Sequence, residues 1–229
     1  MLQGAWGELA GLRYVRVDPE GREAEALPLI IAIHGRGADA SDLAPLAGEL
    51  EPGAYRWILP QGPREVPLGP GYTGWAWYDL GERQRDTVVE SRDRLTSFVA
   101  AVLDQFGLLK DQVLVTGFSQ GGVMTLQVGL TSPDPFAGLA VMSGYIPASE
   151  TLQPVLPERQ DRSVLMVHGV YDQVLEIDRA RQAKALLEGA GLRPEYHEFP
   201  MDHEITAASL AVVREYLRRR LPAGVAADS

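Results

Sequence analysis

Apolar residues along this chain follow two patterns, short continuous runs and longer stretches with helical spacing. Continuous runs such as LPLIIAIHG (27–35) are typical of strands buried on both faces of a parallel sheet. The runs predict strands at 27–35, 55–60, 112–117, 136–142, 163–168 and 194–199, and period-two alternation predicts an antiparallel strand at 13–17. Helical spacing predicts helices at 41–50, 86–107, 120–131, 178–190 and 204–220.

Strands that alternate with helices of this length indicate an α/β fold, a mostly parallel sheet with helices on both faces. We expect one domain over residues 1–221 and a disordered tail at 222–229. Two connections, 61–85 and 144–162, are long. Ligands of open α/β sheets bind beyond the carboxyl ends of the strands, where such connections gather.

Composition and charge narrow the function classes. The chain has 229 residues, of which 45% are hydrophobic and 23% charged, as in ordinary folded proteins. Its net charge of −10 disfavours nucleic acids and anionic membranes as partners. The chain contains no cysteine, which excludes disulfides and thiolate chemistry. Because no signal peptide and no membrane-spanning run is visible, we expect a cytoplasmic protein.

The stretch VLVTGFSQGG (113–122) surrounds one serine with glycines. A flexible turn is one interpretation, and a nucleophile on a tight elbow is the other. Gly117, Ser119 and Gly121 fall between a predicted buried strand and a predicted helix, which is the context that a Gly-x-Ser-x-Gly elbow requires. The glycines are needed there because strand and helix leave no room for Cβ atoms. This placement favours Ser119 as a nucleophile.

A serine hydroxyl needs a base, and the chain has four histidines. His34 and His168 end apolar strands, and His197 lies within a half-exposed strand pattern. His203 lies in a loop between the last predicted strand and the last helix, at the carboxyl edge of the sheet. We therefore predict His203 as the base.

An acid must orient this base and stabilise the imidazolium. Asp172 follows a buried strand at the same edge of the sheet, and Glu176 is the alternative. Asp202 is adjacent to His203, where neighbouring side chains usually diverge. The order Ser119, Asp172, His203 is that of the α/β-hydrolases.

Two backbone amides are candidates for stabilising an oxyanion. One belongs to Gln120, the residue after the serine. The other belongs to Arg36, in the HGRGAD loop (34–39) after the first long buried strand. We interpret His34 as a structural residue that fixes this loop.

Four aromatic residues of the long 61–85 connection are candidates for a substrate pocket, with simple packing as the equal alternative: Tyr72, Trp75, Trp77 and Tyr78. The histidines lack metal-ligand spacing, and no glycine-rich loop has nucleotide-binding spacing. We expect neither a metal nor a cofactor.

The segments IIAIHGRGADASDL, GWAWYDL, GFSQGGVMTLQVGL, VMSGYIP, HGVYDQVLEI and DHEI together resemble the phospholipase/carboxylesterase family, which includes acyl-protein thioesterases and small bacterial carboxylesterases. The resemblance runs from about residue 27 to 220. It implies an α/β-hydrolase fold with almost no lid and a Ser–His–Asp esterase without a cofactor. The resemblance implies that Ser119, Asp172 and His203 form the catalytic triad. It also implies that the amides of Arg36 and Gln120 form the oxyanion hole.

The sequence departs from the thioesterase branch at three places. Arg36 stands where an apolar residue is common, Tyr78 replaces a more usual Phe, and residues 13–28 are unlike that branch. We expect a serine carboxylesterase acting on short to medium acyl esters. An acyl-protein thioesterase, a lysophospholipase or a peptidase with the same triad are the enzymatic alternatives, and a non-catalytic small-molecule binder is the alternative of another class.

The expected partner is thus a small-molecule ester or thioester, and the sequence leaves the oligomeric state open. The acidic balance of the chain mildly disfavours strongly anionic substrates, although Arg36 at the mouth of the site would reverse this locally.

Overall fold

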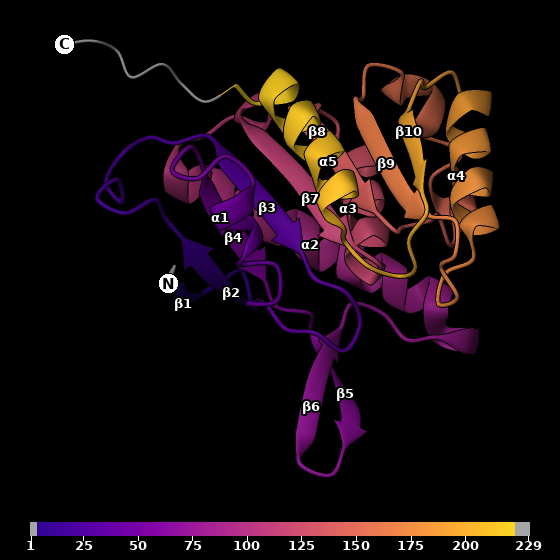
Figure 1. Ribbon diagram of the computed structural model, residues 1–229, viewed down its shortest axis with the longest axis horizontal. Coiled ribbons are helices and arrows are strands. Elements are labelled where there is room, and N and C mark those ends of the chain that lie inside the picture. Colours follow the sequence, from indigo (N-terminus) through magenta and orange to yellow (C-terminus); the bar gives the residue numbers. More distant parts are fainter. Residues whose placement is uncertain (1–3, 223–229) are drawn as a thin grey trace.

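The computed structural model describes residues 4–222, and its centre is an eight-stranded sheet in the order β1-β2-β4-β3-β7-β8-β9-β10 (Figure 1). The strands are β1 (Ala5–Leu9), β2 (Leu12–Val17), β3 (Leu29–Ile33), β4 (Arg56–Pro60), β7 (Val113–Phe118), β8 (Gly138–Met142), β9 (Val164–Gly169) and β10 (Glu195–Phe199). The predicted tail at 222–229 lies outside the described residues except for Pro222.

From β4 to β10 in this order, every neighbouring pair of strands is parallel, and the two antiparallel pairs are β1–β2 and β2–β4. This confirms the mostly parallel sheet of an α/β-hydrolase fold. All five residues of β3 and of β4 are buried, which explains their continuous apolar runs.

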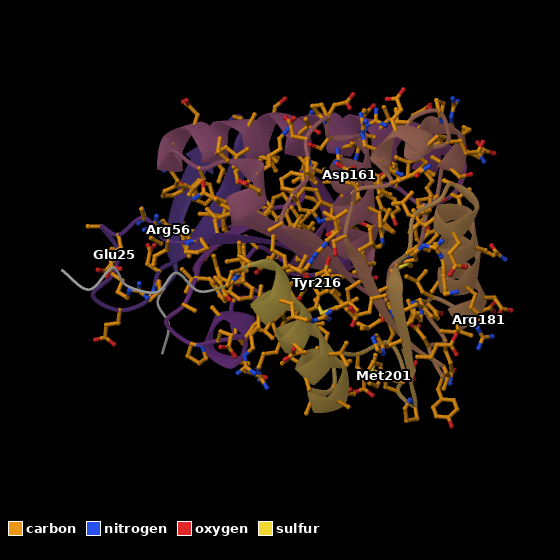
Figure 2. All side chains as sticks on the ribbon, turned by 90° about the horizontal axis from the view of Figure 1, so that it is seen from above. Glu25, Arg56, Asp161, Arg181, Met201 and Tyr216 are labelled. Atoms are coloured by element: carbon orange, nitrogen blue, oxygen red, sulfur yellow. The ribbon has the colours of Figure 1, made fainter. Side chains whose placement is uncertain are left out.

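Helices cover both faces of the sheet (Figure 2). They are α1 (Leu46–Glu49), α2 (Gln84–Phe106), α3 (Gln120–Thr131), α4 (Ile177–Gly189) and α5 (Ala207–Arg220). One buried cluster joins α2, α3 and α4 to one face, and a second joins α1 and α5 to the other. On the second face the Tyr216 hydroxyl accepts from the Leu139 amide at 3.2 Å and bonds to Ser163 Oγ at 2.9 Å. None of the helices within residues 4–222 combines the length and the apolar character needed to cross a bilayer.

Two segments differ from the sequence-based expectation. The connection 61–85 contains an antiparallel hairpin, β5 (Arg64–Gly69) and β6 (Tyr72–Ala76), that projects from the body (Figure 1). Its strands are rich in Gly and Pro and largely exposed, so they lack an apolar run. The predicted helix 41–50 is reduced to α1, because the Asp39 carboxylate accepts from the Ser41 amide at 2.7 Å and sets up turns.

Helix α3 packs unusually close to the sheet. A Cβ atom at Gly121 would lie 1.8 Å from the carbonyl oxygen of Ile33 in β3. A Cβ atom at Gly117 would lie 2.3 Å from the carbonyl oxygen of Gly121. Only glycine fits at either position, because the obstructing atoms belong to the backbone of β3 and α3.

We predict that Gly121→Ala destabilises the protein by about 1–3 kcal/mol or more, the usual cost of overpacking a tight core. Urea unfolding provides the measurement. Gly189→Ala is the matched control, since a Cβ atom there meets no atom within 4 Å. The control is expected to leave stability unchanged or to raise it by up to about 1 kcal/mol. Equal stability of the two variants would contradict the steric argument.

Candidate active site

Ser119 occupies the turn between β7 and α3 with a strained backbone, φ 55° and ψ −119°. A non-glycine residue in such a region costs about 1–3 kcal/mol and persists only where the surroundings hold it. The Ser119 amide donates to the Met142 carbonyl at 2.9 Å, and its own carbonyl accepts from the Val123 amide at 3.1 Å. The turn presents the serine half-buried at the N-terminus of α3.

His203 and Asp172 are hydrogen-bonded, with 2.7 Å between Nδ1 and Oδ2. Asp172 follows β9 and its side chain is fully buried, whereas His203 lies between β10 and α5. The other carboxylate oxygen accepts from the amides of Val174 at 3.0 Å and Leu175 at 2.7 Å. A carboxylate only accepts, so Nδ1 carries the proton and Nε2 is left for another partner. The Phe118 ring packs 4.7 Å from the imidazole, measured between ring centroids.

The two other candidate acids do not contact this imidazole. Asp202 accepts from the backbone amides of His203 at 2.8 Å and Gln173 at 3.1 Å. Glu176 immediately precedes α4 and is exposed. His197 lies on β10 beside Glu195 at 3.2 Å, which agrees with its interpretation as a strand residue.

Ser119 and His203 line the same cavity, which has a volume of about 480 Å³. Its other lining residues are Arg36, Tyr78, Leu80, Gly81, Gln84, Gln120, Tyr145, Val174, Leu175 and Arg179. The cavity therefore brings the serine of the β7–α3 turn and the His203–Asp172 pair to one hollow, lined by aromatic, apolar, amide and basic side chains, at the carboxyl ends of the strands.

Among the four candidate pocket aromatics, only Tyr78 lines this cavity. Trp77, the residue before Tyr78, is buried and donates through Nε1 to the His34 carbonyl at 3.0 Å. Trp75 belongs to β6, and the exposed Tyr72 lies near the tip of the hairpin. The positions of these three favour the packing alternative for the tryptophans and place Tyr72 away from the serine.

The loop after β3 is held by His34. Nε2 of His34 accepts from the Gly62 amide at 2.9 Å, and Nδ1 donates to the Gly35 carbonyl at 2.7 Å. Burial lowers the pKa of His34 to about 4, so the ring is neutral near pH 7. These contacts agree with a structural role. The Arg36 amide, in the same loop, has no hydrogen-bond acceptor among residues 4–222.

Gln120 contributes a contact that sequence reasoning missed. Its side-chain Oε1 accepts from the Trp77 amide at 3.0 Å, and its Nε2 donates to the Tyr78 carbonyl at 3.0 Å. The side chain thus ties the start of α3 to the segment after β6. Its backbone amide, at the helix N-terminus, finds no protein acceptor in the described part of the chain.

Three further residues near the site were also missed. His168 is buried, donates through Nε2 to the Leu175 carbonyl at 2.7 Å, and lies 3.3 Å from Asp172. Burial lowers its pKa. Tyr145 and Arg179 line the cavity from the 144–162 connection and from α4. Tyr145 lies in the VMSGYIP segment and Arg179 in none of the segments that carry the family resemblance, and no local pattern marks either as a neighbour of the serine.

Among residues 4–222, no group of three or more His, Asp and Glu side chains is placed to hold a metal ion.

Comparison with known proteins places this chain in a family. Residues 15–221 match the family described as phospholipase/carboxylesterase. The carboxylesterase SOBER1 of Arabidopsis thaliana is 26% identical over 86% of this chain and 92% of its own length. Acyl-protein thioesterase 1 of Gibberella zeae is 27% identical over 73% of this chain and 77% of its own.

Among solved structures, a carboxylesterase from Mesorhizobium loti superimposes with a TM-score of 0.78 at 20% identity, covering 93% of this chain and 98% of that one. At this identity the superposition supports the fold alone. The match to the family covers nearly the whole chain, and it includes all residues of the candidate site. The chain belongs to the phospholipase/carboxylesterase family.

Proposed function

We propose that this protein is a serine carboxylesterase that hydrolyses short to medium acyl esters through an acyl-enzyme. The observation that carries the proposal is one cavity lined by Ser119 on a strained elbow and by His203, whose Nδ1 is bonded to buried Asp172. A serine held in a costly conformation, in the same cavity as a base whose Nε2 is free, supports catalysis over simple binding.

In acylation, Ser119 Oγ attacks the ester carbonyl while His203 Nε2 takes the hydroxyl proton. Asp172 keeps the proton of the imidazole on Nδ1 and stabilises the imidazolium that forms. The buried carboxylate is itself fixed by two backbone amides, so it needs no rearrangement during the reaction. The imidazolium then protonates the leaving alcohol as the tetrahedral intermediate collapses.

The carbonyl oxygen becomes negative in the tetrahedral intermediate and requires donors. The amides of Arg36 and Gln120 lack protein acceptors among residues 4–222 and belong to cavity-lining residues. Gln120 is the first residue of α3, so its amide lies at the helix end that carries the partial positive charge. In deacylation, water attacks the acyl-enzyme with His203 again as base, and the acid product leaves.

A volume of about 480 Å³ suits a small acyl group, and no described helix covers the cavity as a lid. The same machinery would cleave a thioester or a lysophospholipid. Chain-length preference therefore distinguishes the proposed activity from these alternatives.

We predict that p-nitrophenyl esters from acetyl to palmitoyl are hydrolysed with a maximum at short chains. Ser119→Ala should lower kcat by about 10⁴-fold or more, because no other group replaces the nucleophile. Steady-state kinetics measures both, with circular dichroism to show that the variant is folded. A maximum at long chains would favour a lysophospholipase or thioesterase. Absence of turnover at every length would favour a binding protein.

The assignment of the acid has its own test. Asp172→Asn should lower kcat by about 10⁴-fold, since an amide in place of the carboxylate favours the wrong imidazole tautomer. Asp202→Asn is the matched control, because that side chain accepts only from backbone amides. Loss of one such bond is worth about 1 kcal/mol, less than about tenfold in rate. Equal losses in both variants would reject Asp172 as the orienting acid.

The loop that supplies the Arg36 amide depends on neutral His34, which couples stability to pH. The pKa of His34 is about 4 in the folded protein, against an ordinary value of 6.5. As the pH falls, the unfolded chain therefore binds a proton at His34 at a higher pH than the folded protein does. The stabilisation is complete above pH 6.5 and declines as pH falls towards 4, by about 3 kcal/mol in all.

Urea unfolding of the wild type and of His34→Gln at pH 7.5, 5.5 and 4.5 measures this coupling. The difference in free energy of unfolding between them should shrink as the pH falls, because the variant lacks the titrating group. A difference that does not change with pH would contradict this role of His34.

A further inference from the structure

Positive charge is concentrated in a cavity of a strongly acidic protein. The chain carries a net charge of −10, yet the cavity that holds Ser119 is lined by two arginines and by no Asp or Glu. We propose that the substrate is an ester bearing a second, anionic group, a free carboxylate, which Arg36 and Arg179 bind. The inference rests on the esterase function proposed above.

Arg36 approaches the cavity from the loop after β3. Its side chain is exposed, and no carboxylate of residues 4–222 forms an ion pair with it. The neighbouring Gly35 lies against the serine, since a Cβ atom there would be 3.3 Å from Ser119 Cβ. The backbone of Arg36 is therefore one residue from the contact with Ser119, and its exposed guanidinium remains available to a ligand.

Arg179 approaches from α4, and its guanidinium stacks 5.2 Å from the centre of the Tyr145 ring. The Tyr145 hydroxyl accepts from Gln84 Nε2 at 2.9 Å, which fixes the ring. Like Arg36, Arg179 forms no ion pair with a carboxylate in the described part of the chain. Stacking orients the planar guanidinium without neutralising it, so its donors stay free for an anion.

Arginines of the same region that lie outside this cavity are neutralised. Arg181, two residues further along α4, bonds to Glu198 and Asp178 and lies at the periphery of the molecule (Figure 2). Arg85 pairs with Glu150 at 2.8 Å. Arg36 and Arg179 thus differ from these two neighbouring arginines, whose charges are paired.

Both charges act on the same part of the cavity. Burial raises the pKa of the Tyr78 hydroxyl well above its ordinary value, and the positive charges of Arg179 and Arg36 both oppose this rise. Arg179 also lines a neighbouring cavity of about 710 Å³ together with Glu176 and Asp178, but neither carboxylate lines the cavity that holds Ser119, and Asp178 is paired with Arg181. An anion beside Tyr78 would meet two guanidinium groups and no carboxylate.

Guanidinium groups bind carboxylates through paired, charge-assisted hydrogen bonds. Two such groups near the serine would hold the far end of a short dicarboxylic monoester while its ester carbonyl meets Oγ. A neutral ester of equal length makes no such bonds. The arginines would then select for charge on the substrate, in addition to the selection for length by the cavity.

The test compares p-nitrophenyl hexanoate with the mono-p-nitrophenyl ester of adipic acid, which has the same six-carbon chain and a terminal carboxylate. We expect kcat/KM to be at least about tenfold higher for the adipate ester, as charge-assisted hydrogen bonds provide. Arg179→Gln and Arg36→Gln should each lower the adipate-to-hexanoate ratio several-fold, and 0.5 M salt should lower it in the wild type. Arg193→Gln, an exposed residue just before β10 and outside the cavity lining, should leave the ratio unchanged.

A second pair of esters tests whether the substrate carries its carboxylate on the acyl side or on the alcohol side of the ester. The hexanoyl esters of 4-hydroxybenzoic acid and of 4-hydroxybenzamide differ only in charge on the leaving group. A preference for the benzoate that depends on the arginines would place the carboxylate on the alcohol side. Preference for neutral esters in both pairs, or ratios that neither arginine variant changes, would overturn the proposal.

The esterase function and this inference fail separately. If no ester of either pair is hydrolysed, the esterase proposal fails. Calorimetry with Ser119→Ala protein and the monomethyl ester of adipic acid tests the anion site without turnover. If adding Arg179→Gln to the Ser119→Ala protein weakens binding of this ester at least several-fold, the anion site is supported. If the affinity depends on neither Arg179 nor Arg36, the site is refuted.

Discussion

The contact between the backbones of α3 and β3 determines the geometry of the site. Because Gly121 has no side chain, the first turn of α3 reaches the carbonyl of Ile33 at the end of β3. The β7–α3 connection beside this contact is a tight turn in which Ser119 has a positive φ. This turn brings Ser119 against Gly35, the residue before the Arg36 amide. The serine and the amide of the β3 loop are thus positioned by one packing contact rather than by two separate loops.

The fold, and the proposed triad, could be predicted largely from sequence because both follow local patterns. The elbow segment needed only an apolar run, three glycines and a helical pattern, and the structure has α3 at the predicted residues 120–131. The contact between His203 and Asp172 followed from one rule, that residues just after parallel strands meet at the carboxyl edge. The assignment of catalytic roles to these residues remains a proposal.

Other parts of the site depend on tertiary contacts that leave no local signal. The side chain of Gln120 bonds to backbone groups 42 and 43 residues away in sequence. Arg179 reaches the cavity only because α4 packs beside β9, and its neighbour Arg181 has the same local composition with an opposite orientation. The hairpin β5–β6 was missed for a related reason, since a projecting strand pair buries too little to require an apolar pattern.

The hairpin is attached to the body at its base. There β6 and the loop after β3 exchange two backbone hydrogen bonds, from the Gly37 amide to the Trp75 carbonyl and from the Trp75 amide to the Ala38 carbonyl, each 2.8 Å. At the other end, the turn Gly69–Tyr72 is exposed and contains two glycines with positive φ. Protein engineering can exploit this asymmetry: peptide insertions or fused modules belong at the turn, whereas changes near Trp75 would disturb the loop after β3, which carries the Arg36 amide.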